Sequence, residues 1–452
     1  MQKTQIKDFT QGNITGPLIA FAWPLFLSNL LQVAYNMVDM VVVGKALGKV
    51  GTSAVAVGGD VSAFLTFIAM GFSSAGQVLI AKYIGAKQSD RLGRFVGTMC
   101  GFLLLCAACI GAVALIFQKT ILALMNTPPE SYDGAFAYSA ICMVGLVFIY
   151  GYNLGSAILR GMGDSKHPFM FIGIAAVLNV VLDVLFVMVM DIGAGGAALA
   201  TVISQGVSAV CCAVFLVKKR QQFGLDMRLR DFVRWDKKML EALVKLGTPM
   251  AIKAASVQVS KLFVNSWINS YGVAVSAFAG IANKISSTAN LVSNAMNTAG
   301  STMVGQNIAA KEYGRVKKIL LRLGAITLSI AAICATFLLL FPETVFRLFT
   351  DDMTVLGIVD GYLPIAVLLF LASALRSMMN ALINGSGNYR INFVTAIMDG
   401  IVLRIGLSVL FGLVLKMEHY GFWLGDALAG FTPFWIGVIF YFSGLWKKNK
   451  PE

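Results

Sequence analysis

The side chains of this sequence that could do chemistry are polar groups placed inside apolar segments. Asp39 lies in the stretch YNMVDMVVVG, residues 35–44, which closes a long apolar run. Asp183 follows Asn179 by four residues, a spacing that puts both side chains on one helix face. Thr201 lies early in a further apolar run. A charge at membrane depth costs roughly 2.5–3.5 kcal/mol, which makes these residues candidates for function.

These four residues offer two carboxylates, an amide carbonyl and a hydroxyl, which are hard oxygen donors. Such donors suit a small hard cation. Two carboxylates in a low dielectric also repel each other, which favours proton binding by one of them. We therefore predict that Asp39, Asn179, Asp183 and Thr201 couple transport to Na⁺ or H⁺, and the residue types do not choose between the ions. The alternative is that Asn179 and Asp183 only hydrogen-bond neighbouring helices.

The second half of the chain carries a different set of charges. Lys253 and Lys261 are eight residues apart and therefore near one helix face, and Arg376, Asp399 and Arg404 follow in later apolar runs. We interpret these residues as a charged cluster that meets an anionic or zwitterionic substrate. The alternatives are ion pairing with Asp399 and extension of the basic side chains to a membrane interface.

The elements that must position these residues are membrane-spanning helices. The 452 residues are 58% hydrophobic and 13% charged, whereas soluble proteins carry about 25% charge. Apolar runs of this length predict an all-α membrane protein with about 12 transmembrane helices. The predicted runs cover residues 17–43, 53–81, 96–117, 135–158, 169–190, 196–217, 243–270, 277–306, 319–341, 357–383, 392–415 and 425–446.

Two motifs recur at one separation along the chain. YIGAKQSDR, which begins at Tyr83, matches NIAAKEYGR, which begins at Asn307. LRGMGDSKHPF, which begins at Leu159, matches INGSGNYRINF, which begins at Ile383, again 224 residues later. Such a repeat predicts two pseudo-symmetric six-helix lobes built by duplication. The predicted domains are an N-lobe at 1–217, a cytoplasmic linker at 218–242 and a C-lobe at 243–452.

The repeat does not copy the proposed ion site. Asp39 corresponds to Val264 and Asp183 to Leu407, so the site is expected in the N-lobe alone. The first helix of each lobe does carry a proline, Pro24 in the N-lobe. A proline inside a helix removes one backbone hydrogen bond and permits a kink. We predict that Pro24 lets its helix bend when the charge on Asp39 changes.

The basic residues predict how the chain lies in the membrane. Of those in loops, 25, including Lys3, Arg228 and Lys450, fall in segments on the side of the N-terminus. Only five fall in segments on the other side. The positive-inside rule then places both termini in the cytoplasm. The formal charge of +14 is explained by this topology and needs no nucleic-acid partner.

The chain resembles the multidrug and toxic compound extrusion (MATE) family, in its prokaryotic DNA-damage-inducible-like branch. The resemblance is carried by AWPLFLSNLLQVAYNMVDMVVVG, YNLGSAILRGMGDSKHP, LNVVLDVLF and the repeated GAK and AAK loops. It implies a multidrug efflux antiporter that works by alternating access, with Asp39, Asn179, Asp183 and Thr201 as its cation site. It also implies a substrate cavity lined by Gln32, Tyr35 and Asn153, to which we add Asn36.

The resemblance leaves several further expectations. The chain should be no enzyme, carry no cofactor or bound transition metal, and be monomeric in the cell membrane. Its partners should be small amphiphilic molecules and the lipid bilayer. The alternative function is a flippase for lipid-linked precursors or other amphiphiles of the same superfamily. An intramembrane enzyme would need a nucleophile–base pair or metal ligands at depth, and the sequence offers no protease-type motif or histidine cluster.

Overall fold

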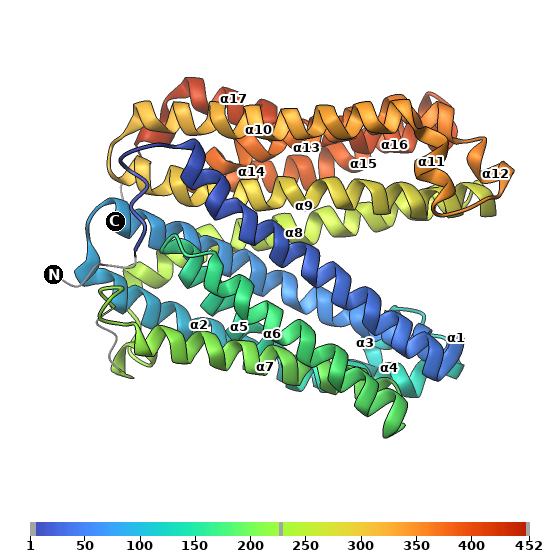
Figure 1. Cartoon of the computed structure of the whole chain (residues 1–452), viewed down its shortest axis with the longest axis horizontal. Helices are drawn as coiled ribbons and strands as arrows, with labels where there is room; N and C mark the ends of the chain where they lie inside the picture. Colours follow the sequence, from blue (N-terminus) through green and yellow to red (C-terminus); the bar gives the residue numbers. More distant parts are fainter. Residues whose placement is uncertain (1–5, 226–228, 449–452) are drawn as a thin grey trace. The chain divides into compact units, whose positions relative to one another are not determined.

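The computed structural model describes residues 6–225 and 229–448 (Figure 1). Within these residues the regular structure is helical, as the apolar runs predict. Lys3, Arg228 and Lys450 of the predicted topology lie outside the described residues, as do the outer ends of the predicted domains and part of the predicted linker.

The first half of the chain forms helices joined by short turns. They are α1 (Thr15–Gly85), α2 (Ser89–Ile116), α3 (Gln118–Leu124), η1 (Pro129–Ser131), α4 (Tyr132–Val144), α5 (Leu146–Gly161), α6 (Lys166–Asp183), η2 (Val184–Val189), α7 (Ala194–Lys218) and η3 (Leu229–Phe232). Here η1 and η3 are 3₁₀-helical, whereas η2 is a π-helical turn.

The second half continues in the same style. Its helices are α8 (Lys237–Asn269), α9 (Val273–Ala309), α10 (Tyr313–Leu340), α11 (Pro342–Arg347), α12 (Met353–Leu356), α13 (Val359–Gly385), α14 (Tyr389–Ile397), η4 (Met398–Val402), α15 (Leu403–Val409), η5 (Leu410–Val414), α16 (Glu418–Ala429), α17 (Thr432–Ser443) and η6 (Leu445–Lys447). Two of the short elements, η4 and η5, are π-helical turns.

These helices account for the 12 predicted spans. Eight helices of the described residues are long and apolar enough to cross a membrane, and nine if α4 and α5, which are bent by 50°, form one span. At a rise of 1.5 Å per residue, the 71 residues of α1 extend for about 107 Å, far more than a bilayer core of ~30 Å, so α1 holds two spans. The remaining two are α8 and α9, which are 33 and 37 residues long but more polar.

The break between the two spans of α1 lies at Gly48. Its torsion angles are φ 63° and ψ −157°, a combination open almost only to glycine. By contrast, α1 stays helical through Pro24, whose carbonyl accepts a hydrogen bond of 2.8 Å from the Ser28 hydroxyl. A bend at Pro24 that depends on the charge of Asp39 therefore remains a prediction.

The chain divides into two compact units, which we describe separately. Of the described residues, the first unit holds 6–8 and 23–247, and the second holds Phe9–Ala22 and 248–448. The predicted lobe boundaries stay a prediction, but the units differ from them in two respects. The beginning of α1 belongs to the second unit, and the described residues between 218 and 247 belong to the first. Each boundary inside a helix falls next to one of the repeated prolines, Pro24 and Pro249.

Backbone hydrogen bonds explain why the N-terminal segment belongs to the second unit. The Phe9 amide donates to Gln306 Oε1 at 2.9 Å, and Asn307 Nδ2 donates to the Phe9 carbonyl at 3.1 Å. Arg315, at the start of α10, donates to the carbonyls of Phe9, Gln11 and Gly12 at 2.9–3.1 Å. The bonds to Phe9, which is buried, satisfy backbone groups that would otherwise be unpaired.

The segment before α8 packs in a comparable way on α2 of the first unit. Two glycines of α2 admit it: a Cβ on Gly101 would lie 2.0 Å from the Phe232 carbonyl oxygen, and one on Gly97 would lie 2.6 Å from Asp231 Cβ. The rings of Trp235 and Phe102 meet edge to face with centroids 6.0 Å apart. Close approach of backbone to helix therefore fixes this segment.

Candidate functional site

The predicted coupling residues come from three helices of the first unit. Asp39 lies in α1, Asn179 and Asp183 lie in α6, and Thr201 lies in α7. Asp183 is the last residue of α6 before the π-helical turn Val184–Val189. Such turns insert an extra residue into a helix and are frequent at functional sites.

Three of these side chains are buried, and several of their polar atoms lack a hydrogen-bond partner among the described residues. Asp39, Asn179 and Asp183 are 8%, 2% and 0% exposed. Among the described residues, both oxygens of Asp183, both polar atoms of Asn179 and Oδ1 of Asp39 have no hydrogen-bond partner. Asp39 and Asp183 lie within electrostatic reach of each other. Because buried charges cost several kcal/mol unless they are compensated, this arrangement suits the binding of a cation or a proton, and the ion site stays a prediction.

The structure adds a residue that the sequence reasoning missed. Tyr138 of α4 is 6% exposed, lies close to Thr201 and is within electrostatic reach of both Asp39 and Asp183. Its phenol is a further polar group beside the two carboxylates. No local pattern distinguishes Tyr138 from other tyrosines in apolar runs, so only the packing of α4 against α7 reveals it.

The predicted cavity residues occupy varied environments. Asn36 is exposed, whereas Gln32, Tyr35 and Asn153 are partly buried. Tyr35 accepts a hydrogen bond of 3.4 Å from Gln205 Nε2 of α7 and lies within electrostatic reach of Asp39. Asn153 Nδ2 donates to the Ile149 carbonyl one turn earlier at 2.9 Å. Tyr35 thus contacts a helix that carries a residue of the predicted ion site, and the roles of all four remain predictions.

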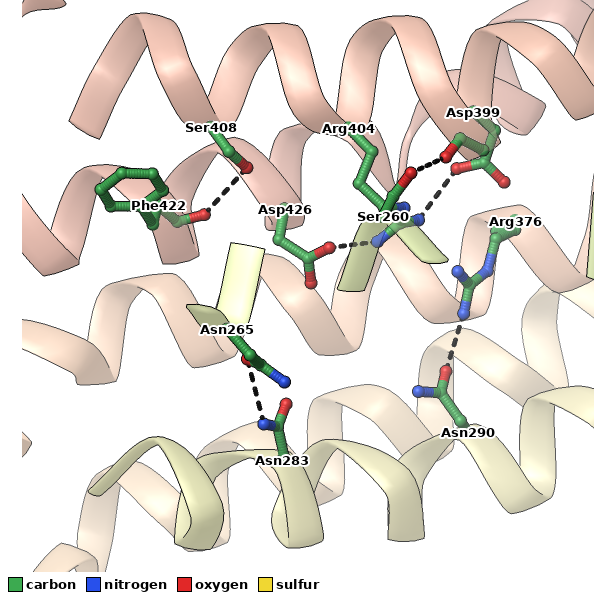
Figure 2. Close-up of polar contacts among 11 residues, drawn as sticks. Ser260, Asn265, Asn283, Asn290, Arg376, Asp399, Arg404, Ser408, Phe422 and Asp426 are labelled. Atoms are coloured by element: carbon green, nitrogen blue, oxygen red, sulfur yellow. Dashed lines mark hydrogen bonds and ion pairs between the residues drawn. The ribbon is translucent and has the colours of Figure 1, made fainter. Parts of the chain in front are cut away.

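The charged residues of the second unit form a network around Arg404 of α15 (Figure 2). Arg404 Nη2 lies 2.9 Å from Asp399 Oδ1, and Arg404 Nη1 contacts Asp426 of α16. Arg404 and Asp399 are 2% and 1% exposed. Ion pairing with Asp399, which is the alternative interpretation of the cluster, is therefore what Arg404 does. Asp426, which the sequence reasoning did not include, completes the network, and it could have been noticed as a carboxylate in the apolar run 425–446.

The other basic residues of this cluster bind amides. Arg376 Nη2 of α13 donates to Asn290 Oδ1 of α9 at 2.7 Å, and Lys253 Nζ of α8 donates to Asn380 Oδ1 at 2.7 Å. Lys261 faces a cavity of the second unit. Among the described residues, neither lysine makes an ion pair within 4 Å. No group of three or more Asp, Glu, His or Cys side chains in the described part of the chain could hold a metal ion.

Comparison with solved structures identifies the class of protein. A MOP superfamily transporter from Pyrococcus furiosus, described as having a binding pocket of reversed polarity, shares the fold with a TM-score of 0.91 at 22% identity, and the match covers 100% of both chains. Together with the many apolar helices, this fold defines a multi-pass membrane protein. The predicted all-α, two-lobed fold is confirmed.

Comparison with sequences then identifies the family. The MatE family model matches twice, over residues 24–185 and 249–410, and the chain belongs to this family. The paired matches confirm the duplication. Two probable multidrug resistance proteins of Bacillus subtilis, YoeA and YpnP, are each 28% identical, over 95% and 98% of this chain and 94% and 98% of their own lengths. Members of the family are transporters and not enzymes.

Proposed function

We propose that this chain is a secondary active antiporter that exports small amphiphilic, often cationic, compounds in exchange for H⁺ or Na⁺. The observation that carries the proposal is the pair of buried carboxylates, Asp39 and Asp183, whose oxygens lack sufficient hydrogen-bond partners among the described residues. Within a transporter family, such a pair is suited to take up and release the ion that drives export. Asn179 and Thr201 complete the donor set.

Coupling follows if the ion and the substrate favour different conformations. A cation or proton bound by Asp39 and Asp183 neutralises their charge and shifts the protein toward the state that holds it better. A ligand shifts a conformational equilibrium only through its difference in affinity for the two states, and the effect of ion on substrate is reciprocal. One cation that moves down ~100 mV supplies roughly 2.3 kcal/mol, so alternating access between two states can drive accumulation outside the cell.

Transport in vesicles tests this proposal. Purified protein is reconstituted, and efflux of a fluorescent organic cation is followed under an imposed Na⁺ gradient or an imposed pH gradient. Asp39→Asn and Asp183→Asn should each lose gradient-driven efflux by at least about tenfold, because a neutral amide can no longer exchange charge with the medium. Asp60→Asn is the matched control, since Asp60 lies in the same helix but is exposed.

The comparison of the two gradients identifies the coupling ion. Efflux that responds only to pH assigns H⁺, and efflux that responds to Na⁺ at constant pH assigns Na⁺. If both aspartate variants keep gradient-driven efflux at the level of the unmodified protein, the assignment of Asp39 and Asp183 as the coupling site is wrong.

The basic cluster of the second unit favours a second candidate, a flippase for lipid-linked precursors or other amphiphiles. Lys253, Lys261 and Arg376 are unlike the acidic lining expected of a cavity for cations alone. The reversed pocket polarity described for the Pyrococcus furiosus transporter is in keeping with a departure of this kind. A flippase would move a fluorescent lipid between leaflets without an ion gradient, which the same vesicles can measure.

We further propose that the chain resides in the plasma or inner cell membrane, with both termini in the cytoplasm, and functions as a monomer. The positive-inside rule supports the orientation. We assign no nucleic-acid partner.

A further inference from the structure

The charges inside the second unit do not balance. Four basic side chains reach into its helical core or its cavity, Lys253, Lys261, Arg376 and Arg404, whereas the carboxylates that face them are Asp399 and Asp426. Arg404 takes both carboxylates as direct partners. An excess of positive charge in a low dielectric is costly unless an anion compensates it.

The excess positive charge lies on side chains whose hydrogen-bond partners are neutral. Arg376 donates to Asn290 Oδ1 and Lys253 donates to Asn380 Oδ1, each at 2.7 Å. An amide oxygen satisfies a hydrogen bond but carries no net charge. Guanidinium and ammonium groups bind carboxylate and phosphate oxygens through charge-assisted hydrogen bonds, which are about twice as strong as neutral ones. Arg376 therefore keeps most of its capacity to bind an anion.

Arg376 also opens onto a cavity that contains a second basic group. Lys261 and Arg376 line this cavity together with Asn283, Ser286 and Asn290, which follow at spacings of three and four along α9 and so share one face. In Figure 2, Arg376 extends toward Asn290. Asp426 lies between Arg404 and the side-chain amides of Asn265 in α8 and Asn283 in α9. The polar side of the cavity thus presents the cations Lys261, Arg376 and Arg404 and several neutral donors, against the single carboxylate Asp426, which pairs with Arg404.

Large aromatic and aliphatic side chains also line the cavity. They are Tyr362, Trp423, Phe370 and Leu369. Trp423 and Tyr362 pack edge to face with centroids 5.2 Å apart, so this wall is ordered by ring contacts. A ligand that fits both sides must combine an anionic group with an apolar or aromatic body.

From these contacts we infer that the cavity of the second unit is a binding site for amphiphiles that carry a phosphate or carboxylate group, with Lys261 and Arg376 as the anion-binding residues. This inference deepens the proposed transport function and rests on it for its physiological meaning, because it assigns a substrate class to a site distinct from Asp39 and Asp183. The binding itself requires no gradient and can be measured alone.

Binding to the full-length protein in nanodiscs of zwitterionic lipid tests the inference. Decyl phosphate and decyltrimethylammonium share an alkyl chain and differ in charge, and isothermal titration calorimetry gives the affinity of each. We expect decyl phosphate to bind more tightly. Arg376→Gln and Lys261→Gln should each weaken it by about tenfold to a hundredfold, the effect of losing one charge-assisted hydrogen bond, with no loss of decyltrimethylammonium binding.

Two further variants serve as controls for the charge and for the folding of the protein. Lys284→Gln removes the same charge from α9, but Lys284 is exposed and outside the cavity lining, so binding of decyl phosphate should not change. Arg376→Lys keeps the positive charge and should retain most of the affinity even if Arg376→Gln folds poorly. Tighter binding of decyltrimethylammonium by the unmodified protein, or an equal effect of Lys284→Gln and Arg376→Gln, would overturn the inference.

Additional arms identify the source of the anionic group and separate the two proposals. Competition by inorganic phosphate indicates a free oxyanion, and competition by phosphatidylglycerol in the nanodisc indicates a lipid headgroup; either supports the anion site. Coupled export without any binding of decyl phosphate refutes the anion site alone, whereas binding without gradient-driven export refutes the antiport function alone.

Discussion

At the scale of single residues, both charged sites adjoin π-helical turns. Asp183 directly precedes the turn Val184–Val189, and Asp399 lies within the turn Met398–Val402. A π-helical turn breaks the regular hydrogen-bond ladder of a helix and displaces the side chains beside it. The aspartates of the two units therefore occupy similar irregularities in α6 and in the helix that begins with α14. Only the first of them lacks a basic partner.

The repeat supplies a substitution that tests the role of Asn179. Its counterpart in the second half is Leu403, so a leucine is compatible with the shared architecture. We expect Asn179→Leu to fold normally but to lower gradient-driven efflux by about tenfold, because the donor set loses an oxygen ligand. Efflux from reconstituted vesicles measures the effect. Unchanged efflux would show that Asn179 serves only the packing of α6.

Arg404 should be the charged residue most important for stability. Arg404→Gln leaves Asp399 and Asp426 without their cationic partner, and Asp399 is 1% exposed. Removing one member of a buried ion pair costs about 3–5 kcal/mol. Thermal unfolding of the purified protein should therefore shift to lower temperature, and by less in Arg376→Gln, whose partner is a neutral amide. An equal shift in both variants would contradict this assignment.

At the scale of elements, the N-terminal segment acts as an anchor. The side chain of Arg315 binds three backbone carbonyls between Phe9 and Gly12. The start of α1 thereby becomes part of the second unit, while α1 continues into the first. The helix α1 is therefore shared between the two units.

Loss of this anchor should loosen the N-terminus without unfolding the protein. In Arg315→Ala, we expect faster amide hydrogen exchange at Phe9 and at the start of α1, because three carbonyls lose their partner. Exchange followed by mass spectrometry measures it. Lys318→Ala is the control, since Lys318 lies one turn further along α10 and is exposed. Equal exchange in the two variants would exclude an anchoring role for Arg315.

The break in α1 should depend on glycine at one position. Gly48→Ala forces a side chain into torsion angles of φ 63° and ψ −157°, which costs about 1–3 kcal/mol. Gly59→Ala changes a helical glycine with open space around its Cβ, so it should be neutral or stabilising by about 0.5–1 kcal/mol. Thermal unfolding of the two variants compares them. Equal melting temperatures would mean that the break does not require glycine.

At the scale of the whole molecule, the proposed orientation predicts which loops face the cytoplasm. Single cysteines are placed at Lys87 and Lys49 in a background without the seven native cysteines. A membrane-impermeant maleimide should label position 87 in inside-out vesicles and position 49 in right-side-out vesicles. The opposite labelling pattern would reverse the topology.

Much of the architecture is readable from the sequence because the bilayer restricts the options. A backbone in lipid must satisfy its own hydrogen bonds, so long apolar runs become helices. The repeat motifs near Tyr83 and Asn307 indicate the duplication directly. The sequence also singles out Asp39 and Asp183, since a charge in an apolar run has few structural explanations.

Other features depend on contacts between segments that are distant in the chain. Tyr138 becomes part of the candidate ion site because α4 packs on α7. Asp426 becomes part of the network around Arg404 because α16 packs on α15. The grouping of Phe9–Ala22 with the second unit depends on Arg315, about 300 residues later. No local pattern encodes such pairings.

The sequence by itself therefore determined the membrane-spanning helices, the duplication and the identity of most charged residues at depth. Only the tertiary structure decided which partner each charge has. Arg404 has two carboxylates, Arg376 and Lys253 have neutral amides, and Asp183 has no hydrogen-bond donor among the described residues. The physical reason is that hydropathy acts on each segment alone, whereas the cost of a buried charge depends on the partners within a few ångströms of it.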